Sequence, residues 1–175
     1  MYFSTFPKIY YDGKGDGNHK VVTNLLRRVA VRAQIKTNAS LFDTYDIKEG
    51  DSPESIAYKM YNDSNLHWII LLLNDITDRF HQWPKTTPQF NAFISEKYDN
   101  PNAVHHYEIT ATSGDTTKKI DIGIDNTDYP TASIVTNFEY EESVEDNNRK
   151  IRLIDPAHIQ QFVKEFRELM QESSF

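Results

Sequence analysis

The stretch TYDIKEGDSPESIAYKMYNDSNLHWIILLLNDI, residues 44–76, decides the fold of this chain. Residues 44–48 alternate between polar and apolar side chains, as a short strand does, and Glu49-Gly50-Asp51 follows as a turn. Asp51 is expected to cap a helix, because Pro53 then lies in the first turn and Glu54 stands three residues on. The sequence therefore predicts a strand, a turn and a capped helix in close succession.

Two helices are expected after this turn. The first presents one apolar stripe, and residues 62–65 break it. The stripe consists of Ile56, Ala57, Met60 and Tyr61. The second helix, residues 66–73, is apolar nearly all round, so it must be covered on most sides. Either the rest of the chain or another subunit has to supply that cover.

Changes of hydrophobic period predict the elements that follow. In order, they are a loop over 80–84, a helix from Pro88 to Tyr98, a hairpin of 105–110 with 118–124, a loop or weak irregular strand over 126–148, and a strand over 150–154. Asp155 and Pro156 then start a terminal amphipathic helix. Its apolar stripe is Ile159, Phe162, Val163, Phe166, Leu169 and Met170.

The first residues of the chain form an aromatic arm with Tyr2, Phe3, Phe6, Tyr10 and Tyr11. The glycine-rich run 12–17 has a lysine where a calcium loop needs an oxygen ligand, which favours a flexible glycine turn. Val22, Leu25, Leu26 and Val29 have helical spacing, and residues 29–36 then alternate as a strand with one basic face.

The composition excludes several classes of protein. The 175 residues include no cysteine, which excludes a disulfide scaffold, a thiolate zinc site and a cysteine nucleophile. A net charge of −7 argues against nucleic acid as a partner. The 10 Tyr, 10 Phe and 2 Trp point instead to protein interfaces, where aromatic residues are enriched.

Charge is unevenly distributed along the chain. Residues 1–50 carry 8 basic and 5 acidic side chains, whereas residues 101–150 carry 4 basic and 10 acidic ones. Arg27, Arg28 and Arg32 lie in the basic stretch, and residues 139–146 form the densest acidic one. Both stretches are explained either as solvated faces or as opposed patches that guide head-to-tail contacts between subunits.

No motif for chemistry is present in the sequence. The six histidines include no pair at i, i+4, and there is no phosphate-binding loop and no Gly-x-Ser-x-Gly elbow. Adjacent His105 and His106 are expected on opposite faces of a strand. The longest apolar run, residues 68–73, is too short to span a bilayer. We expect no enzymatic activity, no cofactor, no metal and no membrane contact.

Residues 44–76 resemble a LysM module, in which a strand, a Gly-Asp turn and two helices precede a second strand. That resemblance implies a sugar-binding groove at Gly50, Asp51, Ser52, Asn74, Asp75 and Ile76. The expected second strand is missing after residue 76, where the chain continues to Trp83 and Pro84. The paired strand must therefore come from elsewhere in the chain, or the groove is altered.

The chain carries, in this order, an aromatic start, Arg27-Arg28, Leu66-His67-Trp68, Trp83-Pro84, and a basic strand with a terminal helix ending at Met170. With this order of features, nearly the whole chain is similar to the small LysM-containing baseplate wedge subunit of contractile-tailed bacteriophages. The resemblance implies a non-catalytic virion protein of the tail baseplate, made and assembled in the host cytoplasm. Implied partners are other wedge subunits, including the lysozyme-like sheath-initiating subunit, and neighbouring wedges.

Together these features predict an α+β fold with a LysM-like strand-helix-helix core, an N-terminal arm and helix, a hairpin region and a C-terminal amphipathic helix. Three segments are expected: 1–43, a LysM-like module over 44–84, and an α+β part over 85–175. A LysM-type module that binds N-acetylglucosamine polymers is the alternative function. The residues expected at partner interfaces are Tyr2, Phe3, Phe6, Tyr10, Arg27, Arg28, Arg32 and Trp83.

Overall fold

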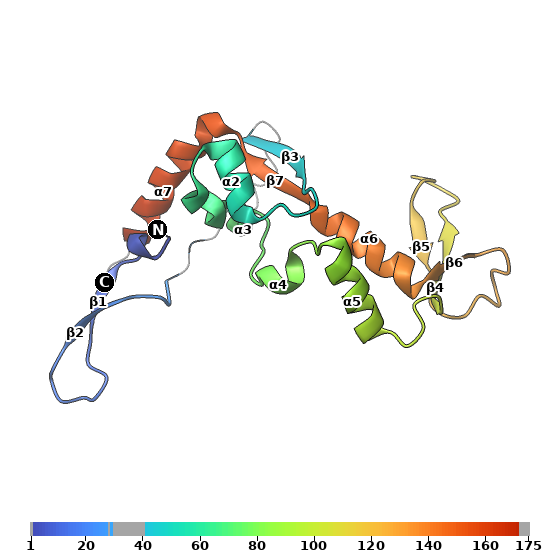
Figure 1. Ribbon diagram of the computed structural model, residues 1–175, viewed down its shortest axis with the longest axis horizontal. Helices are drawn as coiled ribbons and strands as arrows, with labels where there is room; N and C mark the ends of the chain where they lie inside the picture. The colour runs from blue at the N-terminus through green and yellow to red at the C-terminus, as the bar shows by residue number, and fades with distance from the viewer. Residues whose placement is uncertain (1, 28, 30–40, 172–175) are drawn as a thin grey trace. The chain divides into compact units, whose positions relative to one another are not determined.

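The computed structural model describes residues 2–27, 29 and 41–171, and it confirms an α+β fold class with small sheets (Figure 1). The chain divides into unit 1, made of residues 1–82 and 151–175, and unit 2, made of residues 83–150. The division into three segments remains a prediction. Unit 1 includes the terminal helix because that helix packs against residues from the first half of the chain.

The described elements of unit 1 come from both ends of the chain. From the first half they are η1 (Tyr2–Thr5), β1 (Lys8–Tyr11), β2 (Lys20–Thr23), β3 (Phe42–Asp46), α2 (Pro53–Tyr61), η3 (Ser64–Leu66), α3 (His67–Leu73) and α4 (Arg79–Gln82). From the end of the chain they are β7 (Lys150–Ile154, in unit 1 from Ile151), η4 (Pro156–His158) and α7 (Ile159–Gln171). β1 pairs with β2, and β3 pairs with β7.

The turn before α2 uses a different cap from the one expected. Ser52, not Asp51, is the N-cap, and it forms a reciprocal capping box with Ser55, while Pro53 begins the helix. Asp51 instead accepts hydrogen bonds from Tyr45 Oη at 2.8 Å and from Lys59 Nζ at 2.5 Å. The one-residue shift occurs because a serine hydroxyl satisfies the helix N-terminus, which leaves the longer-range contacts to the carboxylate.

The apolar helix α3 receives its cover from the end of this chain. Ile69 and Leu73 form a buried cluster with Ile154 of β7 and with Ile159 and Val163 at the start of α7. The cover therefore comes from within the chain, which was one of the two sources that the sequence left open.

A hydrogen-bonded clamp joins α3 to the strand that pairs with β3. Asn74 Nδ2 donates to the carbonyl oxygens of Ile70 and Arg152, each at 2.9 Å. The Arg152 N–H donates back to Asn74 Oδ1 at 2.9 Å. Tyr61 Oη also donates to the Ile154 carbonyl at 3.1 Å. Strand β7, which is distant from β3 in the sequence, is thus held by its pairing with β3 and by hydrogen bonds from the helices that follow β3.

A second buried cluster ties the N-terminus to α7. Phe6 packs with Phe166 and Met170, and Trp68 lies against them with its ring centroid 4.4 Å from that of Phe166. The three clustered side chains are at most 8% exposed. Residue 6 therefore belongs to the core of unit 1, whereas the residues around it are more open.

Two expectations for unit 1 are wrong. Residues 20–23 form strand β2 rather than the start of a helix, because Val22 pairs with Ile9 across the hairpin. Leu25 and Leu26, which the helical stripe would bury, are 61% and 92% exposed. Residues 79–82 form the short helix α4 inside the expected loop, where Gln82 Oε1 accepts from the N–H groups of Thr77 and Asp78. The basic strand expected over 29–36 lies almost entirely outside the described residues.

Unit 2 combines two helices with a three-stranded sheet. The helices are α5 (Thr87–Lys97) and α6 (Asn137–Arg149), and the sheet has the order β5 (Lys119–Asp121), β4 (Val104–Thr110), β6 (Ser133–Thr136). Both strand pairs are antiparallel, so the expected hairpin is confirmed. Residues 126–148 were expected to be a loop or a weak irregular strand, which β6 confirms in part. The expectation is wrong from residue 137 on, where α6 forms.

Helix α6 is held to its unit by inward-facing carboxylates. Glu141 accepts from Lys97 Nζ at 2.6 Å and Tyr98 Oη at 2.7 Å, and Glu145 accepts from Lys85 Nζ at 2.6 Å. Both glutamates are 6% exposed. The densest acidic stretch is therefore only partly a surface patch, because two of its five carboxylates are neutralised inside unit 2.

The bonds to Glu141 predict an acid-sensitive unit 2. Burial would raise the pKa of this carboxyl, but the bonds from Lys97 and Tyr98 outweigh burial and hold the pKa below its ordinary 4.5. The stabilisation is thus complete above about pH 4.5 and is lost as the pH falls through the lowered pKa. We expect Glu141→Gln to flatten the loss of stability below pH 4.5. Urea unfolding followed by Trp83 fluorescence in a Trp68→Phe background measures it, and an unchanged slope would contradict this assignment.

Candidate interaction surfaces

The N-terminal hairpin is shaped by a carboxylate that organises its turn. Asp12 accepts hydrogen bonds from the N–H groups of Lys14, Gly15, Asp16 and Gly17, at 2.7–3.4 Å. Among these bonds the one from Gly17 has the largest effect, and together they lower the pKa of Asp12 despite some desolvation. Gly15 and Gly17 have φ of +70° and +78°, which favours glycine. The run forms the expected glycine turn, and its expected flexibility stays a prediction.

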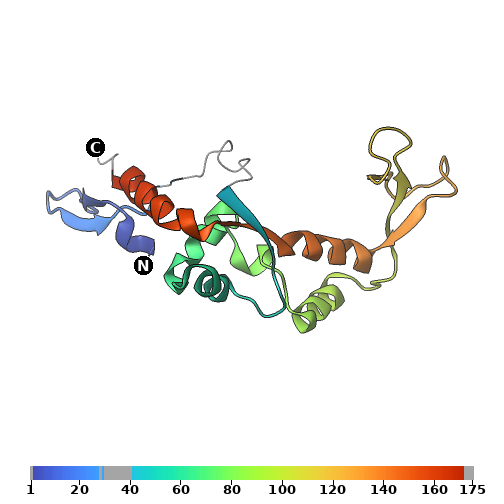
Figure 2. The same ribbon diagram turned by 90° about the horizontal axis from the view of Figure 1, so that it is seen from above.

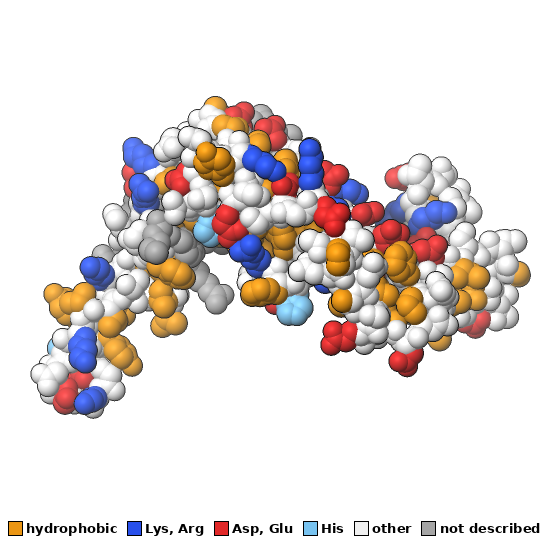
Figure 3. All heavy atoms as spheres, in the orientation of Figure 1, with side chains coloured by type: hydrophobic (Ala, Val, Ile, Leu, Met, Phe, Trp, Pro, Cys, Tyr) orange, Lys and Arg blue, Asp and Glu red, His pale blue; other side chains and the backbone are white. Residues whose placement is uncertain are grey.

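Large side chains of this hairpin are left in solvent. Across β1 and β2, Tyr10 lies opposite Val21, and these residues are 79% and 57% exposed. On the other face Ile9 lies opposite Val22, and Ile9 is 37% exposed. Figure 3 shows hydrophobic side chains along this ribbon with lysine side chains beside them. We call residues 8–23 the aromatic hairpin; its two strands form a separate ribbon in Figure 2.

The residues expected at a partner interface have different environments. Tyr2 begins η1, Phe3 is 59% exposed, and Phe6 is in the core.

The later residues of this set differ as well. Arg27 is half-buried and donates to the Leu169 carbonyl at 3.3 Å. Trp83 is 8% exposed within unit 2. Arg28 and Arg32 lie outside the described residues. Tyr10 and Phe3 are therefore the most accessible aromatic members of this set whose side chains are described.

The residues of the expected sugar groove lie at two turns of unit 1. Gly50 has φ +83° in the turn before α2, and Ser52 caps that helix. The Asp51 carboxylate is engaged by Tyr45 and Lys59, and the Asn74 amide by the backbone of β7. Asp75 has φ +55°, and the Ile76 N–H donates to the Leu71 carbonyl. Their polar groups mainly serve the fold of unit 1.

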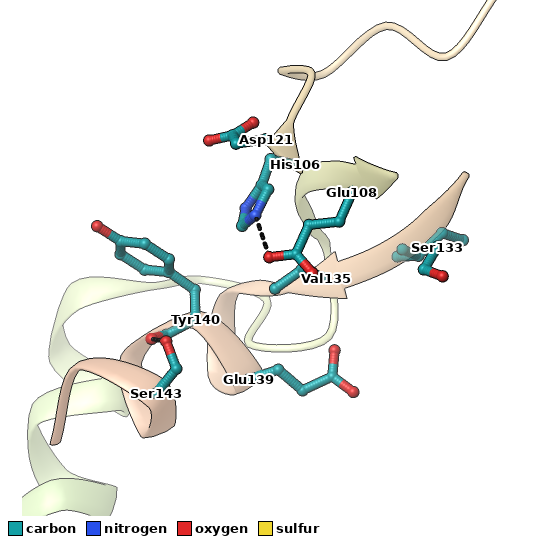
Figure 4. A pocket seen from close by; sticks show the side chains of 9 residues that line it. His106, Glu108, Asp121, Ser133, Val135, Glu139, Tyr140 and Ser143 are labelled. Carbon is teal, nitrogen blue, oxygen red and sulfur yellow. Dashed lines mark hydrogen bonds and ion pairs between the residues drawn. The ribbon is translucent and has the colours of Figure 1, made fainter. Parts of the chain in front are cut away.

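A shallow hollow lies between one face of the unit 2 sheet and α6 (Figure 4). His106 Nε2 lies 3.3 Å from Glu108 Oε1, and the ring of His105 stacks on Tyr140 at 3.9 Å between centroids. The two histidines touch through their Nδ1 atoms at 2.8 Å, so the expectation that they face apart is wrong. An irregular register between Val104 and His106 explains the difference.

The described residues contain no cluster of three or more His, Cys, Asp or Glu side chains able to hold a metal ion. Their helices include none long and apolar enough to cross a membrane. The features that stand out on the surface are therefore the aromatic hairpin and the strands of unit 2. Sequence reasoning missed Val21 and Leu26 as exposed residues, and the Val-Val-Thr run of β-branched residues at 21–23 was the signal available.

Comparison with known proteins identifies the family. Residues 1–109 match the family model described as "Base plate wedge protein 53". The chain belongs to this baseplate wedge protein family. It is also similar to the "Baseplate wedge protein gp53" of Enterobacteria phage T4, with 25% identity over 145 residues, covering 74% of each chain.

As a baseplate wedge protein, this chain is a structural component of the phage virion at the tail baseplate. The family match extends from the N-terminus into β4, so it includes the aromatic hairpin and both turns of the expected groove. The match does not reach α6, β7 and α7. Membership of the family implies contacts with other baseplate components.

Proposed function

We propose that this baseplate wedge protein joins wedge subunits, and adjacent wedges around the hub, through protein–protein contacts made by its N-terminal region. The lysozyme-like sheath-initiating subunit is among the proposed partners. The observation that carries this proposal is the aromatic hairpin, whose Tyr10 and Val21 are exposed on one face. An isolated two-stranded hairpin is marginal in water, so a partner surface that covers this ribbon would stabilise it.

We also propose that β3, α2, α3 and β7 form the LysM-like module suggested by the sequence. In its support, β7 pairs with β3 and is clamped by Asn74, as the missing second strand would be. The module would then be interrupted by α4 and the whole of unit 2. The sugar-binding alternative has less support, because the Asp51 and Asn74 side chains already bind groups of this chain.

Trans-complementation of a phage that lacks this gene tests the proposed role. A chain with Tyr10→Asp and Val21→Asp should fold, since both side chains are exposed, but should fail to enter baseplates. We expect at least a tenfold loss of infective particles, the scale of an interface hot spot. Deletion of residues 1–11 is a poorer test because it also removes Phe6 from the core.

The matched control is Tyr58→Asp, which changes a 62% exposed tyrosine on α2. It should leave both folding and particle yield unchanged. Normal particles from the double hairpin variant would contradict the proposal. Binding of the purified chain to peptidoglycan that is lost in Asp51→Ala, with circular dichroism unchanged, would favour the sugar-binding alternative.

A further inference from the structure

The sheet of unit 2 has two chemically different faces. Directly opposed residues of antiparallel strands share a face, as do residues two apart along a strand. Tyr107 pairs with Ile134 and Ile109 pairs with Ile120, so these four residues form one apolar face. We call it the apolar sheet face.

The opposite face of this sheet is polar apart from Val135, which pairs with His106, and it faces α6. His106, Glu108, Asp121 and Ser133 lie on it and line the hollow with Tyr140 and Ser143 of that helix (Figure 4). A sheet usually turns its apolar face toward the helix that covers it. Here mostly polar side chains face the helix. On the apolar sheet face Ile120 and Ile134 are 44% and 55% exposed, Tyr107 and Ile109 are half-buried, and Ile134 also borders the hollow. Exposed apolar side chains that share one face of a sheet make that face a candidate interaction site.

We propose that the apolar sheet face binds the aromatic hairpin of a second copy of this chain, so that copies associate head to tail. This inference rests on the proposed role of the hairpin in binding partners, and it names one such partner. Each copy carries one hairpin and one apolar sheet face, so each can give and receive one contact. Such a contact is heterologous, so it adds one copy after another and ends only where the copies close into a ring.

Charge complementarity supports this occupant. The aromatic hairpin carries three lysines, Lys8, Lys14 and Lys20, and two aspartates. The carboxylate of one aspartate, Asp12, accepts hydrogen bonds from four backbone N–H groups. The sheet and its loops, residues 104–136, carry five acidic side chains and two lysines. Two of these acids, Glu108 and Asp121, lie on the α6 side, and the other three lie in the loops beside the sheet. Opposite net charges favour this pairing and disfavour hairpin-to-hairpin or sheet-to-sheet contacts.

Shape and side-chain type also match. Both surfaces are short antiparallel sheets, and sheets pack face to face when each contributes one apolar face. The Tyr10 and Val21 face of the hairpin would lie on Ile120 and Ile134 of the neighbour. An exposed tyrosine at the centre of such a contact supplies large apolar area at low conformational cost.

Sedimentation of the purified full-length chain tests the inference. The average mass of the unmodified chain should rise with concentration and fall at high salt. Tyr10→Asp and Ile134→Asp should each weaken association at least tenfold, and Ile120→Asp serves as a second sheet variant. Phe80→Asp, at a side chain that is 87% exposed in unit 1, should leave association unchanged. Circular dichroism verifies that every variant is folded.

An equimolar mixture of the two variants gives the sharpest result. The intact sheet of Tyr10→Asp should bind the intact hairpin of Ile134→Asp, which yields a dimer and nothing larger. A chain that is monomeric at every concentration would overturn the inference, as would a mixture without dimer. Full association of Ile134→Asp alone would also overturn it and indicate a hairpin-to-hairpin contact. A monomeric chain whose hairpin variant is still absent from baseplates would leave the proposed wedge function standing with a different partner.

Discussion

Replacing Phe166 by alanine is expected to lower the free energy of unfolding of unit 1 by about 3–5 kcal/mol, the usual cost of removing a buried phenylalanine side chain. Phe166 is 3% exposed and contacts Phe6, Met170 and Trp68. These side chains come from three separate parts of the sequence, so the cavity left by alanine cannot close by a local shift. The large effect reflects the way α7 completes unit 1.

Urea unfolding measures this effect when followed by Trp68 fluorescence in a Trp83→Phe background. Trp68 lies in unit 1 and Trp83 in unit 2, so each tryptophan reports on its own unit. The control is Leu169→Ala on the same helix, where the side chain is 50% exposed and the expected change is within about 0.5 kcal/mol. Equal effects of the two substitutions would mean that α7 does not pack on unit 1 in this way.

Elements with a local apolar stripe could be predicted from the sequence. Helices α2, α5 and α7 turn their expected stripes inward, except that Leu169 of α7 is 50% exposed. Helix α3, expected to be apolar nearly all round, has Ile69 fully buried, as is Ile56 of α2. Strand β7 was also expected, but its pairing was not. A periodic pattern reports which face of an element is buried, and it carries no information about a partner 100 residues away.

Helix α6 was missed for a specific physical reason. The residues that it buries are Glu141 and Glu145, so no apolar stripe marks its inner face. The local signal was a capping box, in which Thr136 accepts from the Glu139 N–H while the Glu139 carboxylate accepts from Thr136. The sheet topology that exposes the apolar sheet face could not be predicted either, since it depends on the register of β4 with β6.

The aromatic hairpin illustrates the opposite error. Val22, Leu25, Leu26 and Val29 have helical spacing, and a monomer with a local core would bury them on a helix. The chain instead pairs Val22 with Ile9 and leaves Leu25 and Leu26 in solvent. Under the proposed function these exposed side chains belong to a partner surface. Sequence rules that assume burial within one chain misassign such residues.

Removing the carboxylate of Glu145 is the second change with a large expected effect. Glu145 accepts from the Lys85 N–H at 2.9 Å and from Lys85 Nζ at 2.6 Å, and the two side chains are 8% and 19% exposed. Glu145→Ala leaves both the ammonium group and the N–H without this acceptor in a largely buried site. Breaking a buried pair costs about 3–5 kcal/mol, and the partial exposure of Lys85 places the expected loss near the lower limit.

A double variant separates the cost of an unpaired charge from the net value of the pair. Lys85→Met with Glu145→Leu removes both charges and retains apolar volume, so it should recover most of the stability lost in Glu145→Ala. Glu142→Ala, at an exposed carboxylate on the same helix, is the matched control and should change stability within about 0.5 kcal/mol. Unfolding of unit 2 is followed by Trp83 fluorescence in a Trp68→Phe background. If the double variant is as unstable as Glu145→Ala, the pair itself stabilises α6, and the stability of unit 2 depends on the two carboxylates that replace an apolar stripe on this helix.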